Sequence, residues 1–308
     1  IKVSGSVAGI TYALTAMTGG ANNPTYTAGL FPTARYWGVG IPQIFKASVS
    51  VFKTILNARF NEDNAIKDGR GFIGVDDTLG NLTTLIENEN SGMIVHMGNR
   101  LVPSPNPNVN TAQTGASILT PADWRVAEFM GIRSIRMELN APISDFVVAN
   151  NRDSFGGMAL ASLPYHNTPM AQTAVTKANM LFNETEKAQL EALGFTVVDT
   201  NASENAMLMS AVVTNYKTDS IGIADNTFKY LNYVDTASIC REYIFNSMKV
   251  DLAQSRLTEG DTVPDRNIHN DASIKALFME YYSDLADDTL VQAGGAIASA
   301  VSDALDIV

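Results

Sequence analysis

The sequence predicts an α/β fold, with a central, mainly parallel or mixed sheet flanked by helices and a smaller α+β C-terminal domain. Two observations favour this class. Short apolar runs typical of buried strands alternate with segments whose apolar residues recur at helical spacing. In addition, 45% of the 308 residues are apolar, which is enough to build a core in one large domain or two ordinary ones.

The alternation is clearest in the first hundred residues. Strand, helix, strand, helix and strand are expected in turn over residues 34–41, 43–60, 71–75, 80–89 and 92–97. Because a helix separates each strand from the next, the strands are expected to run parallel. Residues 2–18 alternate loosely and predict one or two further strands, which end at a Gly- and Asn-rich turn over residues 19–24.

The second half predicts more helix than strand. Helices are expected from residue 121 to about 131 and over residues 183–193, 236–252, 271–285 and 294–308. Gly194 stands where a helix C-terminus favours glycine. After it, residues 195–198 predict a strand, and residues 206–214 predict its antiparallel hairpin partner.

Charge and cysteine usage narrow the classes of partner. The net charge of −11 argues against nucleic acid and against direct binding to an anionic membrane, since both need clustered Lys and Arg. The acidity serves solubility, or it prevents premature association in a crowded assembly. The lone Cys240 allows no intrachain disulfide, which suits a reducing cytoplasm, and its helical context predicts a small buried side chain. No apolar run reaches the roughly 20 residues that span a bilayer.

The chain begins at Ile1, with neither Met nor a signal-peptide pattern. We therefore expect a processed product or the ordered part of a longer chain.

No catalytic motif is present. The sequence lacks GxSxG, P-loop, HExxH, CxxC and GxGxxG patterns, and the Gly38–Gly40 pair lacks the third glycine of a nucleotide site. His96 is expected at the end of a strand, as a satisfied histidine at a sheet edge. His166 lies in a proline-flanked loop, and the third histidine is His269. Asp76 and Asp77 follow a strand and are expected to cap a helix rather than to bind a cation. We expect no catalytic residue, cofactor or metal.

Several segments together resemble one family. "TAMTGGANNP" (15–24), "ARYWGVGIP" (34–42), "GFIGVDDTLGNLTTLIENENSGMIVHMGN" (71–99) and "NETEKAQLEALGFTVVD" (183–199) are similar, in this order, to parts of the contractile tail sheath proteins of Mu-like bacteriophages. "YLNYVDTASICREYIFNSMKVDLAQSRLTEGD" (230–261) resembles the start of that family's C-terminal domain, and "NDASIKALFMEYYSDLADDTLVQ" (270–292) resembles its next helix. The family has an N-terminal portion ahead of the position of Ile1 and ends in an extended C-terminal strand, where these residues end in an Ala-rich segment; we expect either piece to be disordered, cleaved or outside these residues.

The resemblance implies a subtilisin-like central domain without a protease's catalytic residues. It also implies a division into the end of a small outer element (1–20), a central α/β sheath domain (21–228) and an inner, tube-facing domain (229–308). Lys249, Arg256 and Arg241 are the candidates for contact with the tube, because the rest of the chain is acidic.

By the same resemblance, subunits stack as hexameric rings in a helical sleeve around the tail tube, and extended arms add strands to a neighbour's sheet. Contraction is a rigid-body rearrangement that drives the tube through the host envelope. The implied partners are neighbouring sheath subunits, the tube protein, the baseplate and the tail terminator. The implied location is the virion, after assembly in the bacterial cytoplasm.

Two alternatives belong to other classes. The chain could be another self-assembling protein, of a virion or a surface layer, which electron micrographs would distinguish from a sleeve. It could also be an α/β hydrolase, which requires an Asp, a His and a Ser that converge at strand ends.

Overall fold

The computed structural model describes residues 25–31, 33–34, 36–61, 67–100, 122–138, 164–165, 170, 182–200, 206–208, 211–259 and 268–287. The predicted elements over residues 2–24 and 294–308 lie outside these ranges, as does His166.

The core is a five-stranded sheet whose strands stand in sequence order. β1 (Gly38–Ile41), β2 (Arg70–Gly74), β3 (Ile94–Gly98) and β4 (Phe195–Thr200) are parallel, and β5 (Ala206–Leu208) is antiparallel to β4. β2 and β3 are buried along their whole length, as expected for parallel strands that are covered on both faces. The predicted α/β class, with a mixed sheet, is confirmed.

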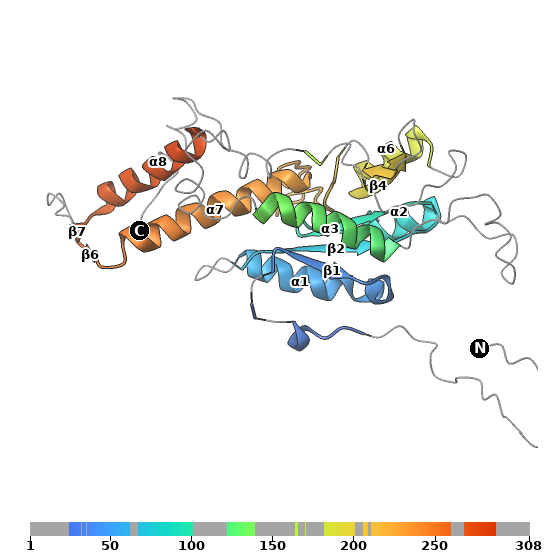
Figure 1. Ribbon diagram of the computed structural model, residues 1–308, viewed down its shortest axis with the longest axis horizontal. Coiled ribbons are helices and arrows are strands. Elements are labelled where there is room, and N and C mark those ends of the chain that lie inside the picture. Colours follow the sequence, from blue (N-terminus) through green and yellow to red (C-terminus); the bar gives the residue numbers. More distant parts are fainter. Residues whose placement is uncertain are drawn as a thin grey trace, which may run out of the picture.

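Helices cover both faces of this sheet (Figure 1). On one face, α1 (Val49–Phe60), α2 (Leu79–Glu87) and α6 (Glu184–Ala192) bury Leu56, Ile86 and Leu190 against Ile73 and Ile94. On the other face, α3 (Ala122–Glu138) buries Val126 and Phe129 against Phe72 and Val95. Apolar burial on both faces is the main stabilising contribution.

Tertiary contacts shift several element boundaries from their predicted places. Residues 43–48 form a 3-10 helix, η2 (Gln43–Ser48), ahead of α1, and a second short 3-10 helix, η1 (Ala28–Leu30), precedes β1. β1 begins four residues later than expected. α3 continues past Gly131 because the next turn buries Arg133.

Two glycines have clear packing roles. Gly194 has φ +88° and ends α6, and a Cβ there would lie 2.5 Å from the carbonyl oxygen of Thr214, so its predicted place is confirmed. Gly74 ends β2, and a Cβ there would lie 2.5 Å from the backbone of Ala122. Gly74 thereby lets the first turn of α3 approach the sheet.

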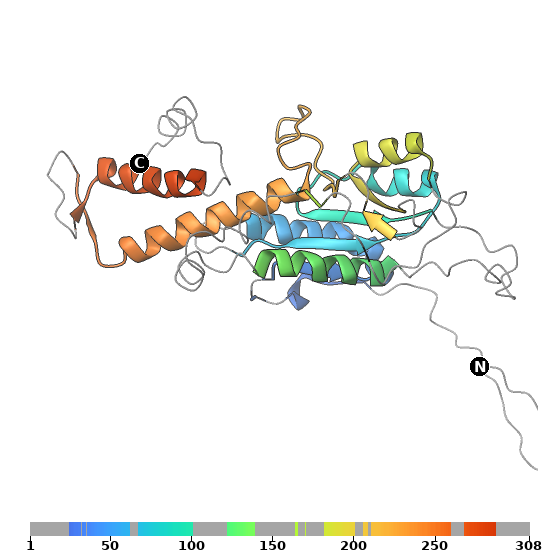
Figure 2. The ribbon, with the colours of Figure 1, turned by 45° about the horizontal axis from the view of Figure 1, so that its top comes forward.

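The last part of the chain extends away from the sheet. α7 (Leu231–Asp251) starts within the core, where Leu231 and Val234 are fully buried, and then projects outward (Figures 1 and 2). β6 (Arg256–Leu257) and β7 (Ile268–His269) form a two-stranded parallel sheet near its far end, and α8 (Asp271–Asp287) returns alongside α7. We call residues 240–259 and 268–287 the distal hairpin.

Candidate functional site

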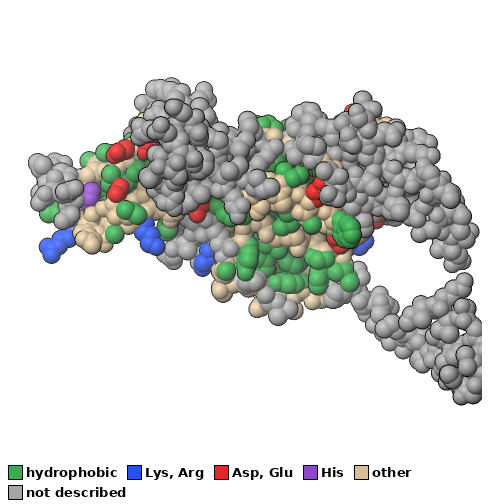
Figure 3. Space-filling view, viewed as in Figure 1, with side chains coloured by type: hydrophobic (Ala, Val, Ile, Leu, Met, Phe, Trp, Pro, Cys, Tyr) green, Lys and Arg blue, Asp and Glu red, His purple; other side chains and the backbone are tan. Residues whose placement is uncertain are grey.

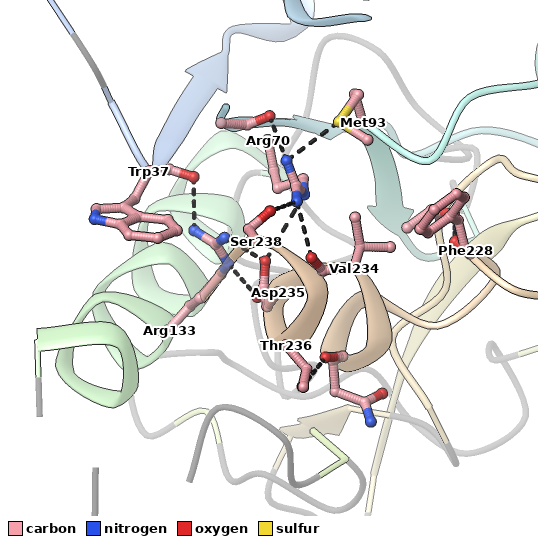
Figure 4. Close-up of polar contacts among 12 residues, drawn as sticks. Trp37, Arg70, Met93, Arg133, Phe228, Val234, Asp235, Thr236 and Ser238 are labelled. Atoms are coloured by element: carbon pink, nitrogen blue, oxygen red, sulfur yellow. Dashed lines mark hydrogen bonds and ion pairs between the residues drawn. The ribbon is translucent and has the colours of Figure 1, made fainter. Parts of the chain in front are cut away.

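A buried charge network joins α7 to the amino end of the sheet (Figure 4). The Asp235 carboxylate on α7 accepts from Nε of Arg133 at 2.9 Å and from Nη2 at 2.6 Å. Nε of Arg70, at the start of β2, lies 3.8 Å from the same carboxylate. Arg70 also donates to the Val234 carbonyl at 3.0 Å and to the Ser238 hydroxyl. The network therefore clamps the first turns of α7 to β2 and α3.

The network is shielded from solvent, because all three charged side chains are at most 3% exposed. Burial alone would lower the pKa of Arg133, but the Asp235 carboxylate more than offsets it and raises the pKa above its ordinary value. One carboxylate serves two arginines, so removal of Asp235 would leave buried cations without their counter-charge. Sequence patterns gave no indication of this network beyond one charged residue inside each of three otherwise packed segments.

Polar side chains also gather at the opposite, carboxyl end of the sheet. Asp76 pairs with the buried Arg125 of α3 and accepts from the Asn99 amide at 2.8 Å. Asp77 accepts from the Thr78 amide at 2.8 Å and from the Asn81 side chain at 2.7 Å, next to the N-cap of α2. The two acids thus stabilise the start of α2 and the seating of α3, in line with the predicted capping role of Asp77.

His96 is buried in the centre of the sheet. It occupies the middle of β3, a central strand, so its predicted place at a strand end and sheet edge is wrong. The ring is fully buried, and its Nδ1 lies 2.6 Å from the Asn215 side-chain oxygen. Its Nε2 has no hydrogen-bond partner among the residues that the structure describes. Desolvation lowers the pKa of His96 to about 4. With an amide as its ring partner, His96 does not form the Ser–His–Asp arrangement that a hydrolase requires.

The Gly38–Gly40 pair makes room for a helix. A Cβ on Gly38 would lie 3.3 Å from Arg133, Met130 and Phe72, and one on Gly40 would lie 3.3 Å from the Met130 sulfur. The glycines of β1 therefore allow α3 to pack closely on the sheet.

Two tyrosine–aspartate pairs hold the distal hairpin together. Tyr243 of α7 donates to Asp284 of α8 at 2.8 Å, and Tyr281 of α8 donates to Asp251 of α7. The two rings meet edge-on with centroids 6.1 Å apart. Burial and the Asp251 carboxylate raise the pKa of Tyr281. We call this arrangement the reciprocal clasp.

Replacing Tyr281 by Phe should loosen the reciprocal clasp without disturbing the sheet. The substitution leaves Asp251 without its phenol donor, which costs about 1.5–3 kcal/mol for a hydrogen bond to a charged acceptor. Hydrogen exchange should accelerate at least severalfold in α8 and stay unchanged in β2 and β3. As a control, Tyr233→Phe removes the same atom from a half-exposed tyrosine at the other end of α7. Equal hydrogen-exchange rates in α8 of Tyr281→Phe and Tyr233→Phe would show that the reciprocal clasp does not hold α8 in place.

The structure separates the three predicted tube-facing residues. Lys249 and Arg256 are exposed on the distal hairpin, next to Val250 and Leu257, each 73% exposed. Arg241 lies instead at the root of the hairpin, where it donates to the Phe60 carbonyl and its guanidinium lies 4.9 Å from the Phe60 ring. Figure 3 shows basic side chains along the α7 side of the hairpin and acidic ones towards α8.

Cys240 is half-buried rather than fully buried, and burial raises the pKa of its thiol to about 11. His269 lies on β7, where its Nδ1 is 3.3 Å from the Ser273 hydroxyl. In the ranges that the structure describes, no group of three or more His, Cys, Asp or Glu could hold a metal ion. Among the described helices, none combines the length and apolarity needed to cross a membrane.

Comparison with known proteins leaves the family unassigned. No protein-family model matches the sequence, and no curated protein matches it. Among solved structures, the fold is similar to a chain of the anti-feeding prophage baseplate, solved by electron cryo-microscopy, with a TM-score of 0.42 and 7% sequence identity. The match covers 82% of this chain and 53% of that one, so the chain spans about half the length of its neighbour.

Proposed function

We propose that the chain is a structural subunit of the contractile sheath of a bacteriophage tail, which stacks as hexameric rings around the tail tube and contracts to drive the tube through the host envelope. The sequence resemblance to Mu-like sheath proteins, which extends over nearly the whole chain, carries the proposal. The α/β core agrees with the fold that this resemblance implies. The charged clusters of this core are engaged in packing, which suits a structural role.

In this proposal the distal hairpin is the tube-facing part of the 229–308 domain, and residues 21–228 form the central domain. Lys249 and Arg256 supply positive charge on an otherwise acidic chain, and Val250 and Leu257 add apolar area beside them. Arg241 contributes by fixing the root of the hairpin on α1. The short parallel sheet of β6 and β7 is the site where an arm of a neighbouring subunit would add a strand.

Reversing the two exposed charges tests the tube contact. The Lys249→Glu/Arg256→Glu variant should bind tail tubes at least tenfold more weakly, because two attractive contacts become repulsive. Co-sedimentation with purified tubes measures the bound fraction. As a control, Thr84→Glu/Ser134→Glu adds negative charge at exposed positions on α2 and α3, outside the distal hairpin. This variant should bind tubes like the wild type. Normal binding by the charge-reversed hairpin variant would disprove the assignment of the tube-facing surface.

Electron micrographs of the purified chain test the proposed function itself. A sheath subunit forms striated sleeves around tubes, and the sleeves shorten on contraction. Flat lattices or closed shells would instead identify another kind of self-assembling protein.

A further inference from the structure

A tight turn between β5 and α7 exposes two apolar side chains. Ile221 is 77% exposed and Ile223 is 60% exposed, although β-branched apolar residues of this size are usually buried. We call these two residues the isoleucine knob. The turn that carries them rises from the sheet on the side of α7 (Figure 2).

The knob is held rigidly. The Asp219 carboxylate accepts from the backbone amides of Ile221 at 3.0 Å and Ile223 at 2.8 Å, and the Asp219 amide donates to the Ile223 carbonyl at 2.9 Å. Gly222, with φ +85°, supplies the left-handed residue that the turn requires. A rigid apolar turn loses little conformational entropy on binding.

The base of the turn is tied to the amino end of the sheet. Lys217 donates to the carbonyls of Ile86 at 2.6 Å and Glu87 at 3.0 Å, at the end of α2. The Asn90 side chain, just before β3, donates to the Thr218 carbonyl at 2.9 Å. Since the Lys217 ammonium is turned inward, the Asp219 and Asp225 carboxylates give the knob an acidic border.

A second exposed apolar surface lies at the opposite, carboxyl end of the sheet. Trp124, in the first turn of α3, is 70% exposed, and Ile44 of η2, which follows β1, is 48% exposed. The Gln43 amide donates to Asp123 at 2.9 Å, which brings these two segments together. Hydrophobic side chains gather on the face of the molecule where α1 lies below α3 (Figure 3).

Lys46, two residues after Ile44, is also exposed. In the part of the chain that the structure describes, no ion pair engages it. We call Ile44, Lys46 and Trp124 the tryptophan patch. It matches the knob in chemistry, because it offers apolar area and the Lys46 cation to an apolar turn with an acidic border. The neighbouring Asp123 carboxylate is already held by the Gln43 amide.

We propose that the isoleucine knob of one copy binds the tryptophan patch of a second copy of this chain, head to tail. The two surfaces lie at opposite ends of the parallel strands of one sheet, so each copy keeps one surface free for the next. Such a heterologous contact repeats without limit unless the rotation closes a ring. The inference rests on the proposed function, in which copies stack, and names the surfaces through which they do so.

A charge-swap series tests this contact in the full-length chain. Ile223→Lys places a cation opposite Lys46 and should lower the assembled fraction about tenfold, since like charges across an interface repel. Lys46→Glu alone should weaken assembly severalfold. The double variant Ile223→Lys/Lys46→Glu should recover assembly to within about threefold of the wild type, because the charges are again opposite.

Sedimentation velocity measures association, and Ala276→Lys, an exposed change on α8, is the matched control. Circular dichroism should show that each monomer is folded, because the substituted side chains are exposed. Failure of the double variant to recover, with both single variants impaired, would overturn the contact. So would normal assembly of Ile223→Lys.

The two proposals can fail separately. Sleeves that form normally from Ile223→Lys would refute the knob contact and leave the sheath function standing. Charge-swap rescue in a chain that never forms sleeves would support the contact and refute the sheath function.

Discussion

Replacing Asp235 by Asn should cost about 3–5 kcal/mol of unfolding free energy, because the nearly isosteric amide leaves Arg133 and Arg70 buried without a counter-charge. Asp235 receives both hydrogen bonds of the Arg133 fork, and it is fully buried. Urea denaturation followed by tryptophan fluorescence should give a clearly lower midpoint. Trp37 lies beside the network, since its main-chain carbonyl accepts from Arg133 at 2.9 Å.

A double-mutant cycle separates the ion pair from simple loss of packing. In the Asp235→Asn background, Arg133→Met should lower the unfolding free energy much less than Arg133→Met does in the wild type. The reason is that the Arg133 cation has already lost its partner in that background. Glu280→Gln, an exposed carboxylate on α8, should change the stability by less than about 0.5 kcal/mol. Additive effects of the two substitutions, or a wild-type urea midpoint for Asp235→Asn, would show that the Asp235–Arg133 ion pair does not stabilise the fold.

The stability of the chain should fall as the pH drops from about 6.5 to about 4, and His96 should account for a distinct part of the loss. The pKa of His96 is about 4 in the folded chain, against roughly 6.5 in an unfolded one. Between these values the unfolded chain binds the proton more readily, so protonation favours unfolding. The shift corresponds to roughly 3 kcal/mol, fully present as stability above pH 6.5 and lost by pH 4.

The measurement compares the unfolding free energy at pH 7 and pH 4.5 for the wild type and His96→Gln. The variant should lose less stability between the two pH values, because its side chain does not titrate. Ser134→Ala, at an exposed position of α3 without an ionisable group, should keep the wild-type dependence. An identical pH dependence for His96→Gln and the wild type would show that His96 does not contribute.

Local sequence patterns predicted the helices and strands in which neighbouring residues share the same surroundings. The apolar run at 71–75 and the helical spacing at 183–193 correspond to β2 and α6, and the capping box of Asn183 and Glu186 fixes the start of α6. The boundaries that moved depend on contacts distant in sequence. α7 begins five residues earlier than predicted, because Leu231 and Val234 pack in the core.

Sequence patterns say less about the candidate site, because charge alone does not distinguish a surface residue from a buried one. Lys249 and Arg256 are exposed as a binding surface requires, whereas Arg241 packs on Phe60. The buried network joins residues more than a hundred positions apart, such as Arg133 and Asp235. Periodicity in a single sequence contains no information about such a pairing.

The continuity of α7 has a mechanical consequence. Its first turns are fixed in the core and its remaining residues project, so the helix acts as a lever arm with one end clamped. Twelve projecting residues, 240–251, extend about 18 Å at 1.5 Å per residue. A core rotation of about 10° would therefore carry the end of α7 sideways by about 3 Å, enough to exchange one set of side-chain contacts for another.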